Sequence, residues 1–377
     1  MRHGKMKTTR LRAPNKTNYC SHAALSAWGG KARRSGWRGD RAPRLQQRWV
    51  VLLGALIALI AFVIVGAFTS ARAEVNSTCY LFSYFVRNGE DGLHLAWSRD
   101  GYKWEALNGG KSYLQPAVGE SKLMRDPCLL LGADGTFHLV WTTAWEGKTI
   151  GYASSKDLIH WSEQKAIPVM AHEPEARNCW APEIAYDVRR QQFIIFWATT
   201  IRGKFPETAG QSENDYNHRI YCTTTKDFVS FTPTRLFYDP GFSVIDATLL
   251  RANGRFYLIV KDETRNPPKK HLRMASSGDI EGPFTDLSPS FTRDWVEGPT
   301  AVKIGDNYIV YYDVYRDKHY AASRSRDLKT WEDVTAQMTF VPGMRHGTVI
   351  AVTDDIVARL REAGSAAPET QGNRPDK

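Results

Sequence analysis

The sequence has few cysteines and no cysteine pattern typical of a zinc site. Only 5 of the 377 residues are Cys, and no Cys-x-x-Cys pair or zinc-type Cys/His spacing occurs. Cys128 and Cys179 have the positions of inward-facing strand residues. Free buried thiols therefore agree with the sequence at least as well as disulfides, which export of the protein would permit.

The main body of the chain also lacks a net charge. The whole sequence carries a formal charge of +10, but residues 1–48 hold 13 of the 50 Lys and Arg residues and one acid, Asp40. The remainder is therefore close to neutral, and we expect no nucleic-acid partner. Residues 1–48 have few large apolar residues and no periodicity, so they are predicted to form a basic disordered tail.

One hydrophobic segment interrupts this polar sequence. Residues 50–68 carry no charge over nineteen positions, which is long enough to cross a membrane as a helix. Ala71-Arg-Ala73 resembles a signal-peptidase site. Segment 49–73 is therefore predicted to be either a transmembrane signal-anchor or a signal peptide cleaved near Ala73. The basic flank places the following body outside the cytoplasm in both cases.

A short phrase with a hydroxyl residue, an Asp and then an aromatic residue occurs five times. Ser and Asp side chains bind nearby backbone N–H groups and mark turns, and each copy follows an apolar alternation of period two, typical of a strand. A supersecondary unit that repeats roughly every 50 to 70 residues is typical of a propeller. The sequence therefore predicts an all-β fold, a five-bladed β-propeller. The copies begin at Ser98, Ser155, Thr225, Ser277 and Ser323.

The ends of this domain, 79–352, predict how the ring closes. Strands predicted at Cys79–Phe85 and Leu93–Trp97 have no inner strand before them, and the last strand, His346–Val352, has no partner after it. Pairing the C-terminal inner strand with the N-terminal strands completes a fifth blade and removes exposed sheet edges. A helical signal occurs at 354–362, and 363–377 is predicted to be a disordered tail.

Each predicted inner strand starts with a polar residue where an apolar one is expected. Inner strands begin around the central channel, so these residues should converge on one mouth. Carboxylates brought together repel, which raises the pKa of at least one and is expected where chemistry needs it. The alternative is that each residue only caps its strand, but the occurrence on all five blades favours a site. The residues are Asp126, Glu183, Asp246, Glu297 and His346.

The body from about Tyr80 to Val352 resembles glycoside hydrolase family 43, a family of five-bladed β-propellers. The resemblance departs from the family at Glu183, where Asp is common, and at Ala247, where Pro is common. The motifs that carry it are Arg125-Asp126-Pro127, Trp180-Ala-Pro-Glu183, Val244-Ile-Asp246, Val296-Glu297-Gly-Pro299 and Arg345-His346-Gly347.

The resemblance implies an inverting hydrolase with assigned roles for these residues. It implies that Asp126 is the general base, Glu297 the general acid, and Asp246 the residue that orients the acid and tunes its pKa. It also implies that His346 lies near a central metal ion, commonly calcium, bound largely through water. Three further motif residues are the predicted substrate-binding side chains. They are Trp180, Glu183 and Arg345.

Inverting chemistry sets its own requirements. A carboxylate must deprotonate water while a carboxylic acid protonates the leaving oxygen, with about 6.5–9.5 Å between the two groups. We expect an Asp246 anion to raise the pKa of Glu297 and Arg125 to keep Asp126 ionised. Trp145 and Trp295 also lie beside the motifs, and ordinary packing is the favoured interpretation of Trp145.

The leading hypothesis is an exported α-L-arabinofuranosidase that acts on an oligo- or polysaccharide. β-Xylosidase, galactofuranosidase and galactanase activities of the same fold are alternatives, as are a fructan-cleaving propeller and a catalytically silent sugar-binding relative. An alternative of another class is a non-catalytic propeller that binds carbohydrate or protein. That alternative leaves the converging acids unexplained, and the Gly-His…Trp-Asp signature of interaction propellers does not occur.

Overall fold

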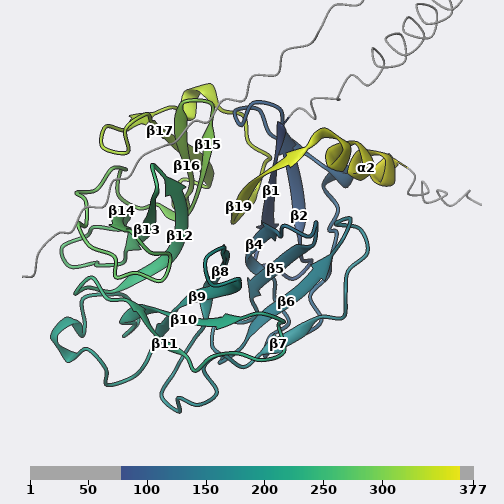
Figure 1. The fold of residues 1–377 in the computed structure, drawn as a ribbon. Coiled ribbons are helices and arrows are strands. Elements are labelled where there is room, and N and C mark those ends of the chain that lie inside the picture. The colour runs from purple at the N-terminus through teal and green to yellow at the C-terminus, as the bar shows by residue number, and fades with distance from the viewer. Residues whose placement is uncertain (1–77, 366–377) are drawn as a thin grey trace, which may run out of the picture. The chain divides into compact units, whose positions relative to one another are not determined.

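The computed structural model describes residues 78–365 (Figure 1). The predicted tail 1–48, the segment 49–73 and residues 366–377 lie outside the described residues. Within 78–365, no helix is both long and apolar enough to cross a membrane.

Five antiparallel sheets form the five predicted blades around a ring (Figure 1). The first contains β19 (Met344–Thr353), β1 (Thr78–Val86), β2 (His94–Ser98) and β3 (Glu105–Ala106). The second contains β4 (Arg125–Leu131), β5 (Phe137–Thr142), β6 (Ile150–Ser155) and β7 (Lys165–Ile167). The third contains β8 (Trp180–Asp187), β9 (Gln192–Thr200), β10 (His218–Thr225) and β11 (Arg235–Tyr238).

The other two sheets complete the ring. The fourth contains β12 (Val244–Ala252), β13 (Arg255–Asp262) and β14 (His271–Ser277). The fifth contains β15 (Glu297–Ile304), β16 (Asn307–Val314), β17 (His319–Ser325) and β18 (Glu332–Asp333). The inner strands β4, β8, β12, β15 and β19 each contact the next one around the ring, β19 with β4 included. Short 3₁₀ helices lie at Asn108–Gly110, Pro206–Thr208 and Thr335–Gln337.

Pairing of the two ends of the described chain closes the ring, as predicted. Strand β19 runs antiparallel to β1 from Thr353 opposite Thr78 to Met344 opposite Val86. The Ser83 hydroxyl donates a 2.7 Å hydrogen bond to the Pro127 carbonyl of the second blade. The closing strand pair is thereby also joined to its neighbour in the ring.

The repeated turns fold as the sequence predicts. Asp157 Oδ1 accepts hydrogen bonds from the backbone N–H groups of Ile159 and His160 at 2.9 and 2.7 Å, and the Ser155 hydroxyl accepts one from Leu158 at 2.8 Å. In the last copy the hydroxyl that takes this position is Ser325, not Ser323. These side chains satisfy backbone donors that the tight turn leaves free of the sheet.

The apolar core lies between blades. Five clusters of buried residues each join neighbouring sheets; in one, Val140 of β5 packs with Trp197 of β9, and both are fully buried. Cys79, Cys128, Cys179 and Cys222 are free and buried, so the described residues contain no disulfide. After β19, helix α2 (Asp354–Ser365) includes the predicted segment 354–362 and extends into the predicted tail.

Gly347 offers a test of the ring closure. A Cβ at this position would overlap the Ser83 carbonyl oxygen on β1. We expect Gly347→Ala to lower the free energy of unfolding by about 1–3 kcal/mol or more, because the backbone of β1 would have to shift. A urea titration measures this change. Gly278→Ala is the matched control, because its Cβ would meet open space. Equal stability of the two variants would contradict the β19–β1 pairing.

Candidate active site

Each inner strand carries the same β-bulge where it leaves the channel mouth. Two residues of the inner strand lie opposite one residue of its neighbour, as where Asp126 and Pro127 lie between the pairs Arg125–Thr142 and Cys128–Val140. The bulged pairs are Asp126-Pro127, Ala181-Pro182, Asp246-Ala247, Gly298-Pro299 and His346-Gly347. Bulges of this kind redirect side chains and are frequent beside active sites. Proline suits the second position in three of them, since it lacks an N–H group that needs a partner.

The first bulged residue adopts a left-handed conformation in four of the five blades. Its φ is +51° at Asp126, +45° at Ala181, +53° at Asp246 and +59° at Gly298. This conformation is strained for residues with a side chain and is typical of functional positions. Gly298 requires glycine for two reasons. Its φ is positive, and a Cβ at this position would lie 2.5 Å from Cγ of His346.

The bulges correct one prediction. The five polar residues do not occupy equivalent positions: Asp126, Asp246 and His346 are first bulge residues, Glu297 precedes its bulge, and Glu183 follows one. Glu183 is buried, accepts a 2.9 Å hydrogen bond from the Thr248 hydroxyl, and does not line the cavity described next. Its position suits support of the strand ends rather than the predicted contact with a sugar.

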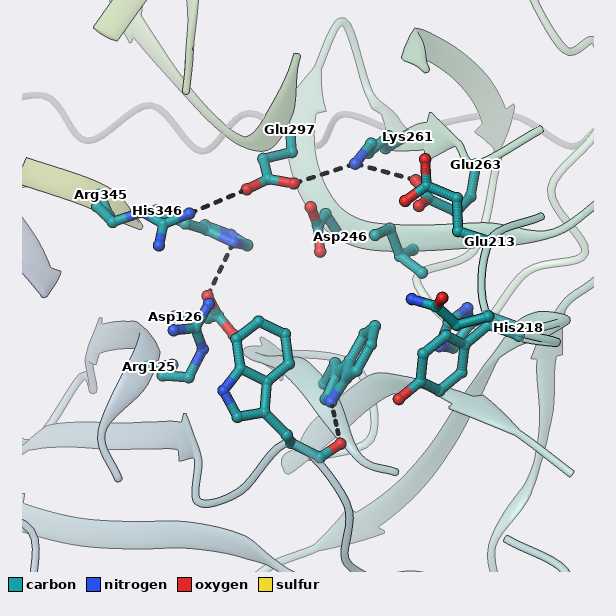
Figure 2. A pocket seen from close by; sticks show the side chains of 15 residues that line it. Arg125, Asp126, Glu213, His218, Asp246, Lys261, Glu263, Glu297, Arg345 and His346 are labelled. Carbon is teal, nitrogen blue, oxygen red and sulfur yellow. Dashed lines mark hydrogen bonds and ion pairs between the residues drawn. The ribbon is translucent and has the colours of Figure 1, made fainter. Parts of the chain in front are cut away.

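A cavity of about 280 Å³ opens at the mouth of the channel, and Asp126, Asp246 and Glu297 all line it. Figure 2 shows the three carboxyl groups around one open space, with His346 between Asp126 and Glu297. They come from β4, β12 and β15, on three different blades. The charged residues and His that line the cavity are Arg125, Asp126, Glu213, His218, Asp246, Lys261, Glu263, Glu297, Arg345 and His346.

Asp126 is held as a carboxylate. The Thr142 hydroxyl donates to its Oδ2 at 2.8 Å, and Nδ1 of His346 lies 3.3 Å from its Oδ1. Burial raises the pKa of Asp126, but the hydrogen bond and charge of His346, followed by the charge of Arg125, bring it to about 2. The same pairing raises the pKa of His346 to about 9 against the opposing effect of burial. The expectation that Arg125 favours the ionised form agrees with this, although His346 contributes more.

Glu297 differs from its prediction. Its Oε2 lies 3.0 Å from Nζ of Lys261 and its Oε1 lies 3.3 Å from Nη2 of Arg345 (Figure 2). Burial raises the pKa of Glu297, but the charge and hydrogen bond of Lys261, then Arg345, hold it below the ordinary value. The sequence predicted a raised pKa because it considered only the neighbouring Asp246, whereas two cations contact this carboxylate directly.

Asp246 is the carboxyl group whose pKa is raised. Burial is the largest cause and brings the pKa to about 6, with His346 and Lys261 opposing it and Glu297 and Asp126 adding to it. Its Oδ2 accepts a 3.0 Å hydrogen bond from the backbone N–H of Gly298, the residue after Glu297. Of the three acids, Asp246 therefore keeps its proton to the highest pH, and it is tied to the strand that carries Glu297.

An aromatic wall faces these acids. Trp145 and Trp180 both line the cavity in an edge-to-face pair 5.7 Å apart, and Trp180 also contacts Tyr216 at 4.8 Å. The sequence interpretation of Trp145 as ordinary packing is wrong, because Trp145 lines the cavity and 49% of its surface is exposed. Arg125 stacks over its ring at 4.2 Å. Trp295 contacts Arg316 and is not a lining residue.

Arg345 and His346 line the cavity from the closing strand β19. Arg345 contacts Glu297 and also places Nε 3.5 Å from Oδ2 of Asp313, a buried acid of β16. Among residues 78–365, no three His, Cys, Asp or Glu side chains form a group that could hold a metal ion. The donor set therefore does not fit direct coordination, and the calcium ion near His346 stays a prediction.

Sequence reasoning missed several cavity residues. Lys261 and Glu263 follow the apolar run of β13 and belong to a charged segment at its end; that run of charge was the available signal. Glu213 and Tyr216 come from the loop 203–217 between β9 and β10, where the polar sequence was the available signal. His218 follows this loop, is 1% exposed, and burial lowers its pKa well below the ordinary value, so its imidazole is neutral.

Comparison with known proteins finds distant relatives of this chain. A curated α-L-arabinofuranosidase of Bifidobacterium longum subsp. longum is 21% identical over 282 residues, which cover 62% of this chain and 26% of the relative. The chain thus spans about a quarter of that relative's length. The crystal structure of an α-L-arabinofuranosidase from Lactobacillus brevis is 18% identical, with 56% of this chain and 72% of that chain covered at a TM-score of 0.44. The crystal structure of an exo-β-1,3-galactanase from Clostridium thermocellum is 16% identical, with 55% of this chain and 47% of that chain covered at a TM-score of 0.45.

A family model gives the clearest match. Residues 76–357 match the model described as a probable glycosyl hydrolase domain related to glycoside hydrolase family 43. This match includes the five blades and the residues named above from Asp126 to His346. The protein therefore belongs to the family of probable glycosyl hydrolase domains related to glycoside hydrolase family 43.

Proposed function

We propose that this glycosidase-type domain inverts the anomeric centre of its substrate and releases terminal α-L-arabinofuranosyl groups from an oligo- or polysaccharide. The observation that carries the proposal is the meeting of Asp126, Asp246 and Glu297, from three blades, in one cavity. Inverting hydrolysis needs a base and an acid on opposite sides of a sugar ring. Residues of different strands around a channel can meet this requirement, whereas neighbours on one strand cannot.

Asp126 acts as the general base in this mechanism. It is ionised, and its hydrogen bonds from Thr142 and His346 fix the direction of its carboxylate. It takes a proton from the water that attacks the anomeric carbon. Glu297 acts as the general acid and protonates the departing oxygen, and Asp246 holds the neighbouring backbone through the N–H of Gly298.

Hydrolysis accounts for the site better than binding alone. Asp126, Asp246 and Glu297 share the cavity with Lys261, which is 2% exposed, and Arg345. Removing so many charges from water costs free energy that a neutral sugar-binding surface would not incur. Clustered acids with divergent pKa values are typical of acid–base catalysis.

The choice of sugar rests on two further points. The curated relative matched by this domain is named an α-L-arabinofuranosidase. The cavity of about 280 Å³ lies just below the usual size range of small-molecule sites, about 300–1,000 Å³. A pocket of this size suits one terminal sugar ring rather than several ring subsites.

Export is the second part of the proposal. The uncharged segment 50–68 and its basic flank would place the domain outside the cytoplasm, either anchored or released near Ala73. Polysaccharide side chains are accessible there. Fractionation of cells that produce the full chain, with protease added from outside, tests this placement.

The catalytic assignment predicts the loss of turnover in two isosteric variants. Asp126→Asn and Glu297→Gln each remove one proton-transfer group, so we expect kcat/KM on an arabinofuranosyl oligosaccharide to fall by about 10²–10⁴-fold or more. Arabinofuranoside, xyloside and galactofuranoside substrates should be screened in parallel. Glu297→Gln should lose more activity on substrates with poor leaving groups, because these need protonation.

Asp306→Asn in the exposed turn after β15 is the matched control. ¹H NMR of the first product should show the inverted anomer. Wild-type rates in a folded Asp126→Asn or Glu297→Gln protein, or a retained anomer, would refute the mechanism.

The pKa values predict an acidic pH optimum. Catalysis needs the proton held by the interacting pair Asp246 and Glu297, whose pKa values are raised to about 6 and lowered, respectively. The protonated form exists below the apparent pKa of the pair, so kcat/KM should be highest below about pH 6 and fall about tenfold per pH unit above it. The pH dependence of kcat/KM, with circular dichroism as a check of folding, tests this. A rate that increases up to pH 8 would contradict it.

A further inference from the structure

A chain of alternating charges runs along one wall of the cavity and includes the proposed general acid. Glu297 Oε2 lies 3.0 Å from Nζ of Lys261, and the same ammonium lies 2.9 Å from Oε2 of Glu263 (Figure 2). Glu263 Oε1 in turn contacts Nζ of Lys270. Glu213, on the loop 203–217, lies 3.9 Å from that ammonium.

The chain extends at both ends. At the loop end, Oε1 of Glu213 lies 3.1 Å from Nη1 of Arg265. At the acid end, Arg345 lies between Glu297 and Asp313. Negative and positive groups thus alternate over eight residues, from Asp313 on β16 to Arg265 beyond the end of β13.

Burial of these charges is unfavourable in free energy. The Lys261 and Lys270 side chains are 2% and 1% exposed, and that of Glu263 is 12% exposed. Each buried charge has lost its water and depends on its neighbours for compensation. Lysines in such positions are rare unless they are paired. An apolar wall would close the cavity at lower cost, so the charges are expected to serve the reaction.

We propose that Lys261 and Glu263 are positioning residues that set the orientation and proton affinity of Glu297. Lys261 contacts both Glu263 and Glu297. The negative charge of Glu263 therefore offsets part of the effect that the Lys261 ammonium has on Glu297. This inference rests on the proposed function for its kinetic test, and it names the residues that regulate the acid. Tyr315, whose ring lies 4.8 Å from Nζ of Lys261, limits where the ammonium can move.

The two residues should act in opposite directions. Loss of Lys261 removes a cation beside Glu297 and makes its proton harder to remove. Loss of Glu263 removes an anion that offsets the positive charge of Lys261. Glu297 is then stabilised more strongly as a carboxylate, and its proton is easier to remove. Asp126, His346, Arg345 and Asp246 face the same carboxylate or its neighbours and are unchanged in both cases. Substitution of a residue with only a structural role would lower kcat/KM at every pH. It would not move the basic limb of the pH profile, where kcat/KM falls as the pH rises.

The test compares the pH dependence of kcat/KM for Lys261→Met and Glu263→Gln on the best aryl glycoside. We expect the basic limb to move up by about one pH unit in the first variant and down in the second. Glu213→Gln should move it in the same direction as Glu263→Gln, but less, because the charge lies further from Glu297. Lys261→Arg keeps the charge and should leave the limb near its wild-type position.

Two designs guard against misfolding and local disturbance. The double variant Lys261→Met/Glu263→Gln removes both charges, so its limb should lie between those of the two single variants even where Lys261→Met is unstable. Lys156→Met and Glu332→Gln each break an ion pair of the outer blades, with Asp134 and Arg324 respectively, and should not move the limb. Shifts of the same sign in Lys261→Met and Glu263→Gln, or no shift in either, would overturn the proposal.

A second readout separates this inference from the proposed function. Carboxyl ¹³C NMR of protein labelled at Glu follows the titration of Glu297 without any substrate, with Glu297→Gln used to assign the signal. Opposite shifts of this titration in the two variants would support the positioning role even if no glycoside were hydrolysed. Hydrolysis with an unchanged Glu297 titration would retain the function and reject the positioning role.

Discussion

The site depends on the pairing of β19 with β1. This contact joins residues more than 250 positions apart and places Arg345 and His346 beside acids from two other blades. Without it, Asp126 would lose the imidazolium that keeps it ionised, and Glu297 would lose one of its two cations. A ring closure that removes sheet edges for the sake of stability therefore also completes the charge balance of the cavity.

The five bulges shape the candidate active site at the mouth of the ring. A regular strand places successive side chains on alternating faces, so a regular inner strand would present only every second residue to one side. Two residues opposite one, with the first in the left-handed region, redirect Asp126 and Asp246 at the channel mouth. The strain is tolerated because the strands on both sides of each bulge remain paired. The candidate site thus lies where the sheet departs from regularity.

Much of the fold could be predicted from the sequence because the repeated turns and the apolar alternation are local signals. The same holds for Asp126, Asp246 and Glu297, which stand in motifs with Pro, Ala or Gly beside them. That the five polar residues occupy different positions relative to their bulges could not be predicted, since the bulges break the period of two. Glu183 was therefore grouped with the channel-mouth residues, although its side chain lies after the bulge.

The prediction of a raised pKa for Glu297 was wrong for a different reason. A carboxyl group responds to every charge within a few ångströms, and the charges beside Glu297 come from β13 and β19, which are remote in sequence. Lys261 lies opposite Ile245 across the β12–β13 pair, on the second strand of its blade, where inner-strand motifs give no information.

The pKa values of the three acids separate because their neighbours differ in charge. Asp126 has His346 and Arg125, Glu297 has Lys261 and Arg345, and Asp246 has mainly burial and a backbone donor. Since the proton stays longest on Asp246, the pair that it forms with Glu297, rather than Glu297 alone, is the unit that titrates. The cations that hold Glu297 in place also weaken its hold on a proton, so the geometry of the acid and its acidity cannot be tuned independently in this cavity.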